Sequence, residues 1–195
     1  LAQHGIDWNI FYQPFGFLLF FTCSLAECNR TPFDLPESEN ELVAGYHTEY
    51  GSMKMGLYLF SEYVNMFVSS AVLASLYLGG FNYPGMDWVL NTLLNQFGET
   101  TGHNLAAAVG VLVFLGKIIF FIFTFMWIRW TVPRFRYDQL MNVAWKWMMP
   151  CAVVNLIIVA AAELSGHRLI ANWIGLLIFA VIYFGLFPIF KKKSV

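Results

Sequence analysis

The chain has 195 residues, of which 58% are hydrophobic and only 12% are charged, and its formal net charge is −1. Because soluble domains carry about 25% charged residues, this composition excludes a soluble globular protein and predicts an integral membrane protein. The aromatic content of 18% fits lipid-facing surfaces and interfacial belts.

Five apolar segments approach the roughly 20 residues that a helix needs to cross the hydrocarbon core of a bilayer. The first is short and rich in Phe, the second carries Glu62 and Asn65, and the third holds Lys117 in a long apolar run. We therefore predict a single membrane domain over 1–195, an all-α, polytopic membrane helix bundle with about five transmembrane helices. The predicted spans are 10–27, 55–79, 104–131, 147–164 and 169–190.

The distribution of Lys and Arg predicts the orientation of these spans. The connection 129–146 and the C-terminal tail are basic, whereas no Lys or Arg falls between Lys54 and Lys117. Since basic loops stay on the inside of a membrane, we expect the connection 80–103 outside and the loops 28–54 and 129–146 inside. Residues 86–94 are typical of a short amphipathic helix lying in the membrane interface as an anchor.

The inside loop 28–54 and its flanks concentrate the negative charge of the chain. Pro32 and Pro36 stop the first helix, and Asp34 followed by Glu37 fits a capping box that would start a short helix over 35–46. Seven of the 12 acidic residues lie in and beside this loop: Glu27, Asp34, Glu37, Glu39, Glu41, Glu49 and Glu62.

Glu37 and Glu41 are four residues apart and would share one helix face. Repulsion and desolvation both favour the protonated form of a carboxyl group, so we hypothesise that carboxylates of this loop exchange protons near neutral pH. Arg30 and Lys54 are the nearby cations that would balance the charge. A solvated acidic surface loop is the alternative. His47 could relay protons or be a structural histidine.

Two ionisable residues fall inside predicted spans, where a charge costs roughly 2.5–3.5 kcal/mol on insertion scales. Glu62 lies eight residues after Lys54 on about the same side of the helix. It could therefore form an ion pair with Lys54, or it could make a hydrogen bond between helices without a role in transport. Lys117 is predicted to serve a proton path or an ion pair, with snorkelling as the alternative.

The basic connection 129–146 fits a positive-inside loop, which accounts for Arg134 and Arg136 but leaves the segment 137–139 unexplained. That segment predicts specific contacts with the acidic loop or with a partner. We find no nucleophile–base pair, phosphate-binding loop, dinucleotide fingerprint or metal-ligand spacing in the sequence. No catalytic or metal-binding residue is therefore predicted, and the three cysteines are interpreted as single buried thiols.

One string resembles a known family closely. It runs Arg30-Thr31-Pro32-Phe33-Asp34-Leu35-Pro36-Glu37 and continues with Glu39, Glu41, Leu42, Val43, Gly45, Tyr46, Glu49 and Tyr50. This string resembles the quinone-site membrane subunit of respiratory complex I, a family known as the H subunit of NADH-quinone oxidoreductase or as NADH dehydrogenase subunit 1. The strings 61–63 and 133–141 resemble the same family in the same order, and the likeness covers about 10 to 163.

The resemblance implies a membrane subunit of a proton-pumping NADH:quinone oxidoreductase that couples quinone reduction to proton translocation through carboxylates. Residues of the quinone cavity would be Glu27, Arg30, Asp34, Glu37, Glu39 and Glu41. The proton path would contain Glu37, Glu39, Glu41, Glu49 and Glu62, to which the arguments above add Lys54 and Lys117. The junction loop toward the peripheral arm would present Arg134, Arg136, Tyr137 and Asp138.

The resemblance also implies the surroundings of the chain. Quinone would be a substrate, no cofactor would be bound permanently, and FMN and iron–sulfur clusters would belong to partner subunits. Expected partners are peripheral-arm quinone-site subunits, small membrane-arm subunits and lipid, with no nucleic acid. The expected location is the bacterial cell inner membrane, or alternatively the mitochondrial inner membrane.

The family has additional N-terminal helices that this sequence lacks, so we expect a fragment or one half of a split subunit whose partner is the N-terminal part. The segment 169–190 would be an extra helix. Three other interpretations stay open: a membrane subunit of an energy-converting hydrogenase-type complex, a secondary ion or proton transporter, and an anchor that docks a soluble partner. A transporter predicts inverted repeats, and none is visible.

Overall fold

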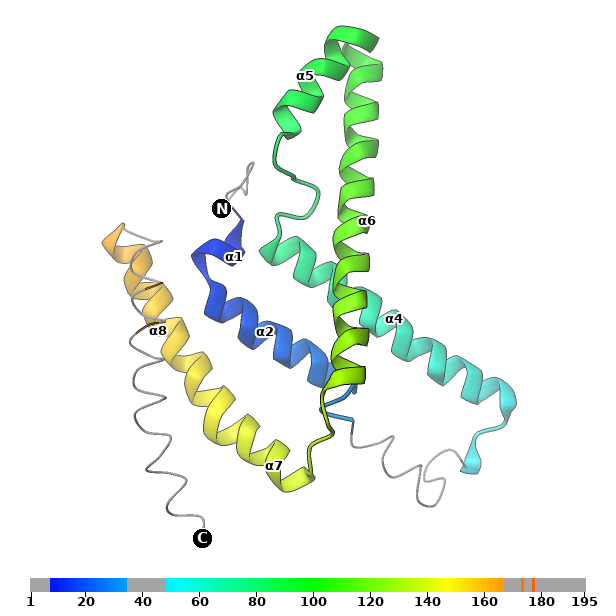
Figure 1. The fold of residues 1–195 in the computed structure, drawn as a ribbon, viewed down its shortest axis with the longest axis vertical. Helices are drawn as coiled ribbons and strands as arrows, with labels where there is room; N and C mark the ends of the chain where they lie inside the picture. The colour runs from blue at the N-terminus through cyan, green and yellow to red at the C-terminus, as the bar shows by residue number, and fades with distance from the viewer. Residues whose placement is uncertain (1–7, 35–47, 167–172, 174–176, 178–195) are drawn as a thin grey trace.

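The computed structural model describes residues 8–34, 48–166, 173 and 177. Their regular structure is helical, which confirms the prediction of an all-α membrane helix bundle (Figure 1). The elements are α1 (Asn9–Tyr12), α2 (Pro14–Glu27), α4 (Ser52–Tyr77), α5 (Met86–Phe97), α6 (Glu99–Thr131), α7 (Tyr137–Asn142), the π-helical turn η2 (Val143–Met148) and α8 (Met149–Ser165).

Three stretches of helix in the described part are long and apolar enough to cross a membrane: Ser52–Tyr77, Glu99–Thr131 and Tyr137–Leu164. The predicted spans 55–79, 104–131 and 147–164 fall on them, and the third stretch joins α7, η2 and α8 into one continuous helix. α2 is a shorter apolar helix because Gln13 has a non-helical backbone and Pro14 begins the helix. The predicted span 169–190 lies outside the described residues, apart from Trp173 and Leu177.

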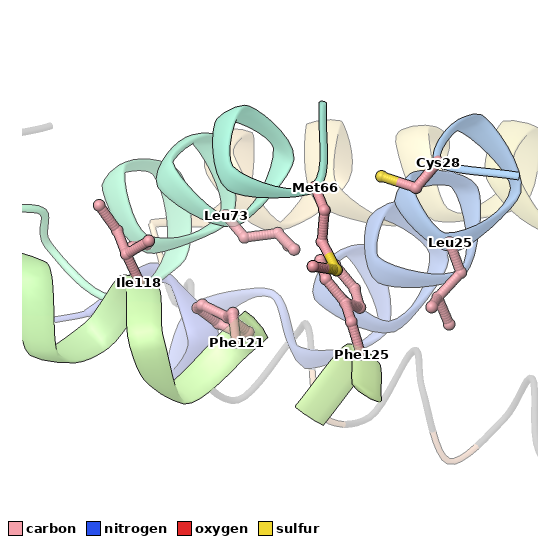
Figure 2. Packing of buried hydrophobic residues seen from close by; sticks show 8 residues of the cluster. Leu25, Cys28, Met66, Leu73, Ile118, Phe121 and Phe125 are labelled. Carbon is pink, nitrogen blue, oxygen red and sulfur yellow. The ribbon is translucent and has the colours of Figure 1, made fainter. Parts of the chain in front are cut away.

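The core lies where α2, α4 and α6 meet. Figure 1 shows α4 crossing α6, and Figure 2 shows the buried side chains between them. Phe side chains of α2 extend this core, and the rings of Phe21 and Phe125 stack with centroids 5.2 Å apart. The buried cluster consists of Leu25, Cys28, Met66, Leu73, Ala74, Ile118, Phe121 and Phe125.

α5 and α6 form a helical hairpin with Gly98 (φ 79°) at its turn. Gly102, Ala106 and Gly110 are buried at a spacing of four residues along α6. A Cβ on Gly102 would lie 3.0 Å from the Cα of Leu94, so the glycine is what permits the close approach of the two helices. The amphipathic helix expected at 86–94 thus corresponds to α5, and α6 holds it in place (Figure 1).

Candidate functional site

The loop after α2 folds back against the helix bundle. Asn29 adopts a left-handed conformation (φ 48°), the Arg30 N–H donates to the Leu25 carbonyl at 3.3 Å, and the Phe33 N–H donates to the Arg30 carbonyl at 2.9 Å. Asn is one of the few residues that visit this region readily. The turn buries two charged side chains, since Arg30 is 5% and Asp34 is 3% exposed. Residues 28–34 therefore do not form a solvated surface loop.

Arg30 lies between two neighbouring residues of α4. Its Nη2 is 3.9 Å from Oε2 of Glu62, and its guanidinium carbon is 5.0 Å from the centroid of the Tyr63 ring. The Nε of Arg30 is buried without a hydrogen-bond partner among the described residues. A separation of 3.9 Å is an ion pair but not a hydrogen bond, so the guanidinium has donors that these contacts do not use.

Two further contacts attach the end of α2 to α4. The Asn65 amide donates to the Glu27 carbonyl at 3.3 Å, and the Cys28 thiol donates to the Ser69 hydroxyl at 3.4 Å. Burial raises the pKa of the Cys28 thiol, and the bond to Ser69 offsets part of that rise. Cys28 therefore stays a neutral thiol near neutral pH and acts as a packing residue. Together these contacts place Arg30 beside α4.

A pocket of about 150 Å³ adjoins Arg30 between α4 and the last turns of α6. Its lining combines two guanidinium groups with aromatic and thioether side chains. Such a lining suits a planar or amphiphilic ligand that carries polar oxygens at one end. The lining residues are Arg30, Tyr63, Met66, Phe125, Met126, Arg129 and Trp130.

The loop after α2 and the connection after α6 touch each other. The Phe135 N–H donates to the Pro32 carbonyl at 3.0 Å, and the rings of Phe33 and Phe135 lie 5.9 Å apart. The sequence predicted a contact between the basic connection and the acidic loop. The contact exists, but the part of it that the structure describes is made by Phe135 and not by the segment 137–139.

The structure brings together only some of the predicted site residues. Arg30 and Glu62 meet, with Asp34 buried in the same turn. The Glu62 ion pair is with Arg30, a residue from another element, whereas the sequence suggested Lys54. The side chains exposed elsewhere are Glu27, Glu49, Lys54, Arg134, Arg136, Tyr137 and Asp138. Glu37, Glu39, Glu41, His47 and the helix expected at 35–46 lie outside the described residues.

Lys117 lies far from this group. Its Nζ donates to the carbonyls of Leu78, Gly80 and Asn82, at the other end of α4. Leu78 follows Glu62 by 16 residues, which is about 24 Å along a helix axis. The structure therefore does not place Lys117 beside Glu62.

Sequence reasoning missed the pocket residues that α4 and α6 supply. Met66 follows Glu62 by four residues and so shares its helix face, and Tyr63 is the next residue along the chain. This spacing could have identified both as neighbours of Glu62. Arg129 and Trp130 were interpreted only as the start of a basic loop. No local signal in the sequence indicates that they border the same pocket as Arg30.

The sequence model of a family described as NADH dehydrogenase matches residues 1–160. The H subunit of the NADH-quinone oxidoreductase of Flavobacterium johnsoniae is 54% identical over 162 residues, covering 83% of this chain and 44% of the relative. An H subunit of the same enzyme of Cytophaga hutchinsonii is 57% identical over 167 residues, covering 84% and 45%. NADH-quinone oxidoreductase subunit 8 of Rhodothermus marinus is 45% identical over 155 residues, covering 80% and 44%. The chain spans less than half the length of these relatives.

Proposed function

Because this chain belongs to the NADH dehydrogenase family, we propose that it is part of the membrane subunit of a proton-pumping NADH:quinone oxidoreductase. In this role it forms part of the quinone-binding cavity and couples quinone reduction to proton translocation. Electrons arrive from partner subunits that hold FMN and iron–sulfur clusters. This chain contributes the site where charge at the quinone is converted into a change of carboxyl protonation.

The observation that carries the proposal is the position of Arg30. Its buried guanidinium lines the pocket between α4 and α6 and also faces Glu62 at 3.9 Å. One cation is thus shared between a ligand space and a carboxylate. A negative charge in the pocket would therefore compete with the Glu62 carboxylate for the Arg30 guanidinium.

The coupling step follows from this shared cation. Conversion of a quinone to a quinol takes two electrons and two protons, so negative charge develops on the quinone oxygens until protons arrive. That charge attracts the Arg30 guanidinium and weakens its hold on Glu62, whose carboxylate then takes up a proton. When the quinol is complete and leaves, Arg30 returns to Glu62 and the proton is released. The carboxylate acts as an electrostatic switch.

Other acidic residues extend this path in the proposal. In the proposal Glu27 and Asp34 belong to the quinone cavity of the complete subunit, although the pocket beside Arg30 is not lined by them. Glu49 and Lys54 belong to the proposed proton path, at the point where α4 begins. The carboxylates of Glu37, Glu39 and Glu41 connect the cavity to Glu62. The junction loop with Arg134, Arg136, Tyr137 and Asp138 meets the peripheral-arm subunits. The location is the bacterial inner membrane, since the named relatives are bacterial.

The direct test is Glu62→Gln in the full-length subunit of the assembled complex. Gln keeps the size of the side chain but cannot bind or release a proton. We expect proton uptake driven by NADH oxidation in membrane vesicles to fall by about 100-fold or more, the range of effects for a positioned proton-transfer group. Assembly, checked on a native gel, is expected to be normal.

Glu99→Gln is the matched control, because Glu99 is exposed at the first turn of α6 and away from the pocket. This variant is expected to reduce quinone and to take up protons at normal rates. Normal proton uptake by an assembled Glu62→Gln complex would refute the coupling role. Loss of assembly with normal turnover of the remaining complex would instead support an anchor function for this corner.

A further inference from the structure

The ammonium group of Lys117 is held by backbone carbonyls at the end of α4. Its Nζ donates to the carbonyl oxygens of Leu78 at 2.6 Å, Gly80 at 2.9 Å and Asn82 at 2.6 Å. An ammonium group has three N–H donors, so every donor of Lys117 is used. The same Nζ lies 4.9 Å from the centroid of the Trp8 ring, within the range of a cation–π contact.

The backbone that presents these carbonyls is built by two glycines. α4 ends at Tyr77, and Gly79 and Gly80 follow in left-handed conformations (φ 73° and 55°). The Gly80 N–H returns to the Ala74 carbonyl at 3.0 Å, and the Asn82 N–H donates to the Gly79 carbonyl at 2.9 Å. These bonds fold residues 78–82 into a turn whose alternate carbonyls converge on one point.

Convergent carbonyls in this place need a positive partner. Leu78 is the C-cap residue of α4, so its carbonyl lies at the negative end of the helix dipole, and the carbonyls of Gly80 and Asn82 join it from the turn that follows. In an apolar environment each unsatisfied backbone group costs several kcal/mol. A single ammonium group satisfies three of them at once, whereas a neutral amine keeps only two N–H donors and would leave one carbonyl unpaired.

We propose that the turn 78–82 is a primary-ammonium site, that Lys117 is its built-in occupant, and that the resulting clamp joins α4, α6 and Trp8. Arg could not replace Lys117 in it, because a planar guanidinium does not present three donors from one nitrogen. The contacts that Lys117 makes within the described residues are carbonyls and an indole ring, and neither accepts a proton. In this proposal Lys117 acts as a fixed structural charge.

The test is chemical rescue of Lys117→Ala in the full-length subunit of the assembled complex. The substitution removes three methylenes and the ammonium group, which propylammonium can replace in the open site. We expect thermal unfolding of the variant to be faster by on the order of tenfold, as for loss of hydrogen bonds to a charged group. Added propylammonium is expected to restore most of the stability. Tetramethylammonium at the same concentration has no N–H donor and is expected to restore none.

Equal rescue by both cations, or no rescue of an assembled variant by propylammonium, would overturn the proposal. If Lys117→Ala assembles only when propylammonium is supplied, the proposal is supported most strongly. If the variant fails to assemble even with propylammonium, the proposal is overturned. Lys117→Met adds a second readout, since it keeps the length of the side chain. A stable Lys117→Met complex that pumps fewer protons per electron would make Lys117 a relay. Stability is the primary readout, so the clamp can fail or hold independently of the proposed coupling at Glu62.

Discussion

Arg30 is a buried cation whose hydrogen-bond donors are not all used by its contacts within the described residues. Its ion pair with Glu62 spans 3.9 Å, its ring contact with Tyr63 is non-directional, and its Nε has no hydrogen-bond partner in the described part of the chain. A buried arginine that serves only stability would be expected to have all its donors satisfied. The proposed mechanism uses these unsatisfied donors, since it requires Arg30 to exchange Glu62 for a negative charge in the pocket.

A double-mutant cycle tests whether Arg30 and Glu62 act as one unit. Arg30→Met removes the cation, and Glu62→Gln removes the carboxylate. If each acts only through the other, the double variant should lose no more proton uptake than the worse single variant. We expect a coupling energy of about 1–3 kcal/mol, the range for residues in direct contact. The cycle needs the rate of proton uptake in vesicles for four assembled complexes: the parent, the two single variants and the double variant.

Arg30→Lys separates charge from geometry in the same cycle. It keeps the positive charge but loses the planar fork that can face Glu62 and the pocket together, so partial activity is expected. Strictly additive losses from Arg30→Met and Glu62→Gln would show that the two residues serve separate roles, and the shared-cation mechanism would be wrong.

At the scale of elements, α6 carries different contacts along its length. Its first turns hold α5 at Gly102, its middle holds the end of α4 through Lys117, and its last turns line the pocket. The helix has 33 residues, about 50 Å at 1.5 Å per residue. It therefore extends past a hydrocarbon core of about 30 Å, which is why it can hold a hairpin at one end and a pocket at the other.

Gly102→Ala is expected to loosen the hairpin of α5 and α6. The added Cβ would meet the backbone of Leu93 and Leu94 at 3.0–3.1 Å, and backbone atoms cannot move aside as a flexible side chain can. Forced repacking of this kind costs about 1–3 kcal/mol. The measurement is the thermal stability of the purified complex, compared with that of the parent.

Gly116→Ala is the control on the same helix. Its new Cβ would meet nothing within 4 Å, and Ala in a helix interior is favoured over Gly by about 0.5–1 kcal/mol. This variant should be as stable as the parent or slightly more stable. If both substitutions had the same effect, the close approach of α5 to α6 would not depend on Gly102.

The sequence predicted the class of fold and the segments that form its long helices, because apolar length and turn residues are local properties. It did not predict the ion pair of Glu62, because that pair joins two elements and Lys54 was the nearest cation along the chain. The sequence also did not predict the contacts of Lys117 with the turn 78–82, since the three carbonyls lie 35–39 residues away and belong to the backbone. The pattern of side chains in a sequence does not indicate where backbone carbonyls converge in the fold.

At the scale of the whole molecule, the loop after α2 and the connection after α6 are joined although they lie about 100 residues apart in the sequence. Pro32 ends the turn that buries Arg30, and Phe135 precedes the long helix formed by α7, η2 and α8. Within the described residues, a backbone hydrogen bond and a ring contact connect them. We expect a displacement of the Arg30 turn to be felt at the connection after α6 through this link.

Removal of that hydrogen bond tests the link. Phe135→Pro deletes the N–H donor and leaves the buried Pro32 carbonyl without this partner, at a cost of about 1–3 kcal/mol. Phe135→Leu keeps the N–H and an apolar side chain, so it isolates the role of the bond. We expect assembled Phe135→Pro complexes to reduce quinone more slowly and to take up fewer protons per electron, with Phe135→Leu close to the parent. A Phe135→Pro complex that assembles and couples normally would mean that the Arg30 turn works without the junction loop. The coupling would then be confined to α2, α4 and α6.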